Sequence, residues 1–291
     1  MVSGLSGPDL LYWLSPLVAF AVSFATSMGG VSGAFLLLPY QISVLGITSP
    51  SVSATNQLFN VLATPGGVYR YWKESRMVWP LALCLALGTL PGVVLGAFIR
   101  LEYLPDPTRF KLFAAGILAL LGVRMVWKLR GRAGGTAQHT FPIEEMHTAD
   151  GHIRFRLGTQ HYTCSRPGII ALSVVVGMAG GIYGIGGGAI IAPFLVSMCG
   201  LPVHAVAGAS LFGTLITSVV GVVTYQLMAP LYPHLVVTPD WTLGLLLGMG
   251  GLAGTYLGAR CQRHVPAHII TWILAGVVLF TAGKYALDFL L

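Results

Sequence analysis

Eight long apolar segments dominate this chain of 291 residues, and their number limits what it can fold into. An α-helix needs about 20 apolar residues to cross a bilayer, and most of the segments fit one crossing. Only 9% of the residues are charged, whereas a soluble globular protein carries about 25%. We therefore predict an all-α polytopic membrane protein. The segments run over residues 12–45, 52–70, 77–99, 109–128, 168–199, 203–227, 241–261 and 268–290.

The first and fifth segments are longer than one crossing requires, and each contains a glycine run. Residues 180–188 read Gly-Gly-Ile-Tyr-Gly-Ile-Gly-Gly-Gly. Each glycine inside a helix costs about 0.5–1 kcal/mol relative to alanine, so the run indicates a special backbone role. Positive φ angles, close approach of another helix, or exposed N–H groups would each explain it. We predict that both segments are broken or re-entrant, which gives eight to ten crossings.

The segments form two copies of a four-segment unit. When Pro39 is set against Pro193, the glycine runs align. Further along, the Gly-x3-Gly-x3-Gly stripe that starts at Gly88 falls on the stripe that starts at Gly250. Such stripes let two helix backbones pack closely, and repeated halves are common in transporters. The predicted division is a first membrane repeat over 1–128, an insert over 129–167 and a second membrane repeat over 168–291.

The insert is the one clearly polar region. Residues 152–157 alternate polar and apolar side chains, Gly158 and Thr159 supply a turn, and residues 160–164 can return as a second strand. This pattern predicts a small β-hairpin. Because an isolated hairpin is marginal in water, we expect it to pack on the membrane domain, a partner protein or a second copy.

Lys and Arg indicate the orientation of the chain. With eight simple crossings, eleven of the 16 lie on the side of the insert; if segments 1 and 5 each cross twice, twelve do, and the halves become inverted repeats. Positive residues gather on the cytoplasmic side, so both counts predict a cytoplasmic insert. Residues 1–10 lack the Lys or Arg that begins a cleavable signal peptide, so we expect the first segment to be retained.

Polar residues follow each glycine run. Asn56 and Asn60 share a helix face, and a matching stripe is formed by Ser210, Thr214, Thr217 and Ser218. Hydroxyls can bond to the backbone one turn back, but a buried amide needs several partners, and a substrate can be one. The candidate substrate-binding residues are Gly29, Gly30, Gly33, Thr55, Asn56, Gln57, Asn60, Gly184, Gly186, Gly187, Gly188, Ser210 and Thr214.

Charged residues are missing from the middle of the segments. All nine acidic residues map to loops or segment ends, which argues against a cation carrier or a carboxylate proton relay. We also expect no Lys or Arg there, so an anion would be held by N–H dipoles, amides and hydroxyls. Arg124 and Lys284, near segment ends, would bind lipid headgroups or draw anions in.

Other kinds of site find no support. The glycine run lacks the strand before it and the Gly-Lys-Ser/Thr ending of a nucleotide loop. The His and Cys residues of the insert match no zinc pattern, and the four cysteines predict no disulfide framework. We expect no enzyme activity, metal, cofactor or nucleic-acid partner. His204, beside Pro202, is a candidate residue at a pore mouth.

The residues Gly181-Ile-Tyr-Gly-Ile-Gly-Gly-Gly-Ala-Ile-Ile-Ala-Pro193 and Pro202-Val-His-Ala-Val-Ala-Gly-Ala-Ser210 resemble the TauE/SafE family, described as sulfite exporters and anion permeases. The resemblance extends over nearly the whole chain except 129–167. The first-half version, residues 27–34, departs from the glycine-rich form. The resemblance implies transport of small sulfur-containing anions such as sulfite or organosulfonates.

The leading hypothesis is a secondary transporter or permease that exports such anions across the cell inner membrane. A negative-inside potential would help export of an anion. One alternative is a metal-cation transporter, which would need a membrane-embedded Asp, Glu or His. Another is a non-transporting membrane scaffold or assembly protein. The expected partners are the small anionic substrate and the lipid bilayer, and a homo-oligomer or partner protein would contact residues 129–167.

Overall fold

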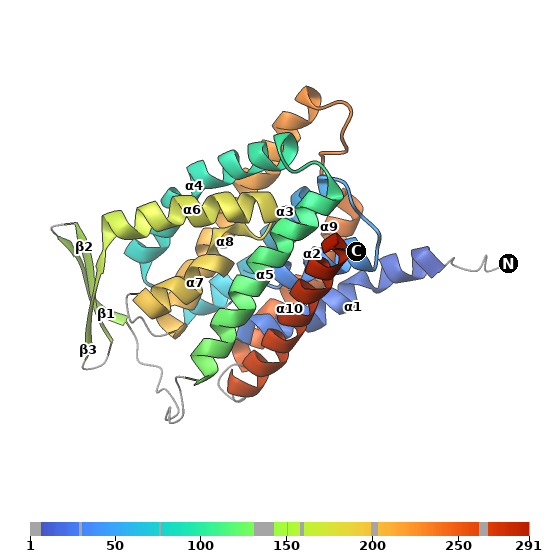
Figure 1. The fold of residues 1–291 in the computed structure, drawn as a ribbon. Coiled ribbons are helices and arrows are strands. Elements are labelled where there is room, and N and C mark those ends of the chain that lie inside the picture. Colours follow the sequence, from blue (N-terminus) through green and yellow to red (C-terminus); the bar gives the residue numbers. More distant parts are fainter. Residues whose placement is uncertain are drawn as a thin grey trace.

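The computed structural model contains ten α-helices and a three-stranded sheet in the residues that it describes. These residues are 7–28, 31–75, 77–130, 143–149, 151–157, 160–198, 203–261 and 267–290. Before the sheet come α1 (Gly7–Met28), α2 (Ala34–Ser43), α3 (Ser51–Lys73), α4 (Trp79–Glu102) and α5 (Pro107–Arg130) (Figure 1). After it come α6 (Arg166–Tyr183), α7 (Gly186–Met198), α8 (Val203–Met228), the short 3-10 helix η1 (Ala229–Leu231), α9 (Trp241–Cys261) and α10 (Ala267–Leu290).

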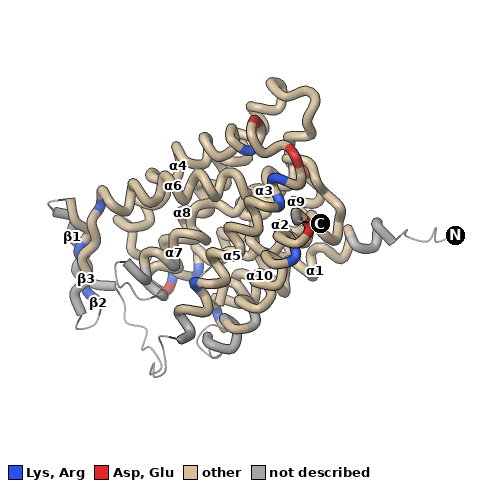
Figure 2. The backbone as a smooth tube through the Cα atoms, viewed as in Figure 1, with Lys and Arg blue, Asp and Glu red and all other residues tan. Residues whose placement is uncertain are grey.

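Five of the described helices are long and apolar enough to cross a membrane, namely α4, α5, α6, α8 and α9. Shorter apolar helices occur over Tyr12–Met28 and Ala34–Ser43. Large apolar side chains such as Leu87 and Phe280 remain exposed, as lipid-facing positions do. Charged residues lie mostly toward the helix ends and on the sheet (Figure 2). This is the architecture of a multi-pass membrane protein.

The predicted breaks in the first and fifth segments are both present. The segment over 12–45 is divided between α1 and α2, and the segment over 168–199 is divided between α6 and α7. α7 packs back against α6, so the fifth segment turns at its break instead of continuing as one straight helix. In Figure 1, α1 begins and α10 ends on the side of the molecule away from the sheet.

The two glycine stripes pack closely, as predicted, and each packs on a helix from the other half of the chain. α4 packs on α6, and α9 packs on α1. A Cβ atom at Gly92 would overlap the carbonyl of Val174, and one at Gly250 would overlap the carbonyl of Pro16. These glycines therefore permit backbone-to-backbone contact between the two halves. At the centre, α3 packs on α8, while α5 pairs with α10.

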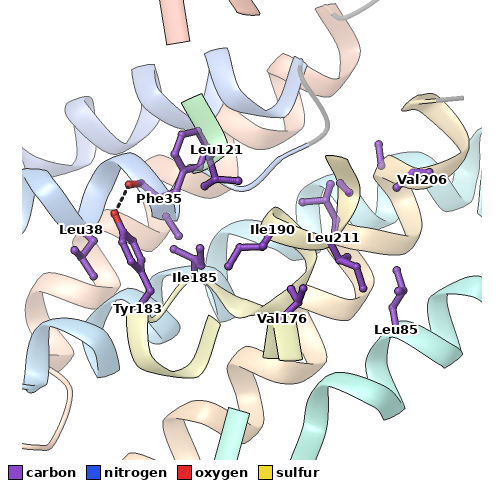
Figure 3. Close-up of a cluster of buried hydrophobic side chains, with 14 of the residues drawn as sticks. Phe35, Leu38, Leu85, Leu121, Val176, Tyr183, Ile185, Ile190, Val206 and Leu211 are labelled. Carbon is purple, nitrogen blue, oxygen red and sulfur yellow. Dashed lines mark hydrogen bonds between the residues drawn. The ribbon is translucent and has the colours of Figure 1, made fainter. Parts of the chain in front are cut away.

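Apolar side chains surround the break between α6 and α7 (Figure 3). Ile185, in the break, and Ile190, on α7, are both buried. Tyr183 ends α6, and its hydroxyl donates a hydrogen bond to the carbonyl of Phe35 on α2 at 2.9 Å. The second break is thus held in place by a short helix of the first half.

The sheet is larger than the sequence predicted. The expected strands are present as β2 (His152–Leu157) and β3 (Gln160–Ser165), but β1 (Ile143–Ala149) adds a third, antiparallel strand beside β2. The pairing of β1 is interrupted between Glu144 and His147, and its sequence, Ile-Glu-Glu-Met-His-Thr-Ala, lacks the strict alternation of polar and apolar residues that would have predicted a strand. Ile153, Phe155 and Cys164 are buried, so one face of the sheet is packed.

Candidate functional site

The break between α6 and α7 is formed by glycines in left-handed conformations. Gly184 ends α6 with φ of +83°, and Gly186 begins α7 with φ of +67°. The N–H groups of Gly184 and Ile185 both donate to the carbonyl of Gly180, at 2.8 and 3.1 Å. Residues with a Cβ atom rarely adopt such φ angles, which explains why glycine stands at both positions. The positive φ angles predicted from the glycine run are therefore confirmed. The turn directs the N-terminus of α7 into the protein interior.

The first turn of α7 lies directly on the polar stripe of α8. A Cβ atom at Gly188 would overlap the carbonyl of Ser210, and one at Gly186 would lie 2.8 Å from Cγ2 of Thr214. The N–H of Gly187 donates to Oγ1 of Thr217 at 3.4 Å. The glycines of α7 therefore bring its N-terminal N–H groups beside the hydroxyls of α8.

Three hydroxyls of this stripe are buried without a hydrogen-bond partner. They belong to Ser210, Thr214 and Ser218, each at most 1% exposed. A hydroxyl inside a helix usually donates to a carbonyl one turn back, and Thr217 does so, to Gly213 at 2.6 Å. The other three do not. Buried polar atoms are normally paired, so these hydroxyls are the strongest sign of a ligand in this region.

Two amides of α3 add further unpaired atoms. Gln57 donates through Nε2 to the carbonyl of Gly180 at 3.4 Å, but its Oε1 has no partner. Asn60 accepts a hydrogen bond from Ser32 through Oδ1, while its Nδ2 has none. Gly180, the residue to which Gln57 bonds, packs against the second break, since a Cβ there would lie 2.7 Å from the carbonyl oxygen of Gly186. Gln57 is therefore beside that break.

Other predicted site residues are engaged elsewhere. Asn56 donates to the carbonyl of Ala34 at 2.9 Å and accepts from Nε2 of Gln41 at 3.3 Å, so both ends of its amide position α2. Thr55 accepts a hydrogen bond from the N–H of Asp240 at 2.8 Å, beside the start of α9. A Cβ at Gly33 would lie 2.9 Å from Oγ of Ser23 on α1. Gly29, Gly30 and the side chain of His204 lie outside the described residues.

The structure also places polar residues that sequence reasoning passed over. Ser32 and Gln41 are buried and bond to Asn60 and Asn56 of α3, and Thr89 on α4 lies against Gly187. Each is a polar residue within an apolar segment, and that pattern was the one sequence feature that could have indicated a buried polar site. Sequence reasoning also did not foresee that Arg100, one residue beyond the apolar segment over 77–99, would be buried, with 0% of its surface exposed. The apolar pattern ends at residue 99, but α4 continues to Glu102 and neighbouring elements cover the guanidinium.

Comparisons with known proteins agree with a transporter. The family model described as sulfite exporter TauE/SafE matches residues 16–285. A probable membrane transporter protein of Xylella fastidiosa strain 9a5c is 29% identical over 90% of this chain and 89% of its own length. The probable membrane transporter protein YunE of Bacillus subtilis is 23% identical over 88% of this chain and 90% of its own. No solved structure matches the chain. Because the family model covers nearly the whole sequence, this membrane protein belongs to the sulfite exporter TauE/SafE family.

Proposed function

We propose that this protein is a secondary transporter that moves small sulfur-containing anions, such as sulfite or an organosulfonate, across the cell inner membrane. The observation that carries the proposal is the set of three buried, unpaired hydroxyls on Ser210, Thr214 and Ser218 beside the N-terminus of α7. Substrate binds beside these hydroxyls, at the first turn of α7 over Gly186–Gly188. Gln57 and Asn60 complete the site from α3.

The chemistry of the site suits an oxyanion. The N-terminus of a helix carries partial positive charge and free N–H groups, which attract anions. Serine and threonine hydroxyls and the Nδ2 of Asn60 donate hydrogen bonds, whereas Oε1 of Gln57 only accepts. An atom that can only accept is suited to the proton of a singly protonated oxyanion, which the hydroxyl oxygens can also accept. The site therefore holds an anion without a full positive charge beside it.

The architecture supports an inverted repeat with ten crossings. Each half contributes five helices, and the contacts of α4 with α6 and α8 have counterparts in those of α9 with α1 and α3. An odd number of crossings per half gives the halves opposite orientations, as in many transporters. With this topology, twelve of the 16 Lys and Arg lie on the side of the sheet, which makes that side cytoplasmic.

The charge distribution favours export of an anion. In the described ranges, none of the buried polar residues is an acid, so no membrane-embedded carboxylate is available there to bind a metal cation or carry a coupled proton. A negative-inside potential contributes about 2.3 kcal/mol per charge per 100 mV to outward movement. Transport is then driven by the potential or by the substrate's own proton.

A transport assay with matched threonine variants tests the proposal. Purified protein is screened by thermal shift with sulfite, thiosulfate, taurine, sulfoacetate and sulfolactate, and flux of the stabilising anion is measured in proteoliposomes. Thr214→Val removes an unpaired hydroxyl, and we expect about a tenfold loss of affinity. Thr224→Val is the control, because that hydroxyl on the same helix bonds to Val220 at 2.7 Å. Absence of flux for every sulfur anion would refute the proposal.

A further inference from the structure

Among the residues that the structure describes, Arg100 is the one whose charged side chain is buried. It lies near the end of α4, one turn beyond Gly96, where a Cβ would be 3.0 Å from Cα of Gly181 on α6. Its guanidinium lies 3.9 Å from the ring of Phe110, and that ring contacts the ring of Tyr183. Arg100 is therefore beside the end of α6 that lies away from the sheet.

Most of the hydrogen-bonding capacity of Arg100 is unused. A guanidinium has five N–H donors. Nη1 donates to the carbonyl of Leu104, but Nε and Nη2 are buried without a partner. The carboxylates nearest in the chain have other partners: Glu102 accepts from the hydroxyl of Tyr232 at 3.0 Å, and Asp106 accepts from the N–H of Arg109 at 2.9 Å. No described carboxylate forms an ion pair with Arg100.

The last carbonyls of α6 do not supply the missing acceptors. The carbonyl of Gly181 accepts from the hydroxyl of Tyr225 at 2.9 Å, and the carbonyl of Ile182 accepts from the hydroxyl of Ser53 at 2.9 Å. Neutral donors thus already satisfy this helix end. A buried charge without a counter-charge is costly, so an acceptor from outside the chain is expected.

We infer that Arg100 is a second anion-binding position, at the end of α6 away from the sheet, for an oxyanion that offers two oxygens to Nε and Nη2. The planar guanidinium binds two oxygens of one group side by side, which a lysine cannot do. This inference rests on the proposed function, since the same sulfur oxyanion would occupy Arg100 after leaving the hydroxyl site on α8. The position serves the exit side of an exporter.

The test compares Arg100→Gln with Arg109→Gln, an exposed arginine near the start of α5 at the same end of the molecule. Uptake of radiolabelled sulfite is measured in uniformly oriented proteoliposomes, with substrate offered to either face. For Arg100→Gln we expect the KM to rise about 10- to 100-fold at the face away from the sheet, and less than about threefold at the sheet face. Arg109→Gln is expected to change neither value.

A purely structural arginine would behave differently. Among the molecules that fold, removing it would lower only the maximal rate, or would change the KM equally at both faces. Either result would overturn the inference. If Arg100→Gln does not fold, Arg100→Lys keeps the charge and loses the paired donors. We then expect the same one-sided rise in KM, and an unchanged KM would reject the site.

A second readout separates this inference from the proposed function. Sulfite is added to the detergent-purified wild type and to Arg100→Lys, and the thermal shift is recorded. If the wild type transports no sulfur anion but sulfite stabilises it and fails to stabilise Arg100→Lys, the site stands and the transport proposal fails. If the wild type transports sulfite and both Arg100 variants keep a normal KM, only the inference about Arg100 fails.

Discussion

The two helix breaks of this protein differ in how completely their polar side chains are paired. At the first break, Ser32 bonds to Asn60, and Asn56 bonds to both Ala34 and Gln41. These bonds connect α2 firmly to α3. At the second break, the hydroxyls at the corresponding positions of α8 have no partner.

Setting Pro39 against Pro193 explains the difference. Ser32 then corresponds to Gly186, and Gln41 corresponds to Leu195, so the two side chains that close the first break are absent from the second. The first break is held by hydrogen bonds among its own residues, which leave Oε1 of Gln41 and Nδ2 of Asn60 without a partner. The second leaves donors open beside a helix N-terminus, which is the arrangement expected where a substrate binds.

The largest effect on transport is expected when a residue of the second break is replaced by its counterpart in the first break. Gly188 corresponds to Ala34, so Gly188→Ala installs the first-half residue. Its Cβ would overlap the carbonyl of Ser210, and relieving that overlap separates α7 from α8 at a cost of about 1–3 kcal/mol. We expect transport per folded molecule to fall at least about 100-fold, because positioning errors of about 1 Å have effects of that size. Transport per folded molecule is measured as flux in proteoliposomes, normalised to the amount of monodisperse protein.

The reverse substitution, Ala34→Gly, is the matched control. It costs about 1 kcal/mol of helix stability and should leave sulfite transport within about twofold of wild type. If the two substitutions reduced transport equally, the breaks would contribute equally and the comparison would be wrong.

A large loss of stability, without loss of affinity, is expected at the first break. Asn56→Leu leaves the carbonyl of Ala34 and the amide of Gln41 without their partner. Each buried polar group left unpaired costs about 1–3 kcal/mol, so the melting temperature should fall clearly. The sulfite affinity of the remaining folded protein, measured by calorimetry, should stay within about twofold of wild type. A loss of sulfite affinity without a fall in melting temperature would show that Asn56 contacts the substrate.

The sequence predicted the membrane class, both helix breaks and the close contacts of the glycine stripes, because these follow from segment length and glycine spacing. It did not separate Asn56, which bonds within the protein, from Thr214, which does not, since a polar residue in an apolar segment looks the same in either case. Arg100 was missed because burial near a helix end depends on what packs over it. The strand β1 was missed because its pairing is irregular.

A smaller effect is expected at Ser210, where we expect the affinity for sulfite to change but not the stability. Its hydroxyl has no partner in the protein, so Ser210→Ala removes no internal hydrogen bond. The melting temperature without ligand should be unchanged or slightly higher. The Kd for sulfite should rise about 3- to 10-fold, corresponding to about 1 kcal/mol. A lower melting temperature with unchanged Kd would mean that the hydroxyl is structural.

The smallest effect is expected at Ser32, the counterpart of Gly186. Its hydroxyl donates to Asn60 and accepts from the N–H of Ala34, so Ser32→Ala loses internal bonds and no ligand contact. Hydrogen bonds between membrane helices average about 0.6 kcal/mol, which predicts a slight fall in melting temperature. The Kd for sulfite should change less than about twofold. A change in Kd as large as that of Ser210→Ala would show that substrate also contacts the first break, because both hydroxyls would then face the same anion.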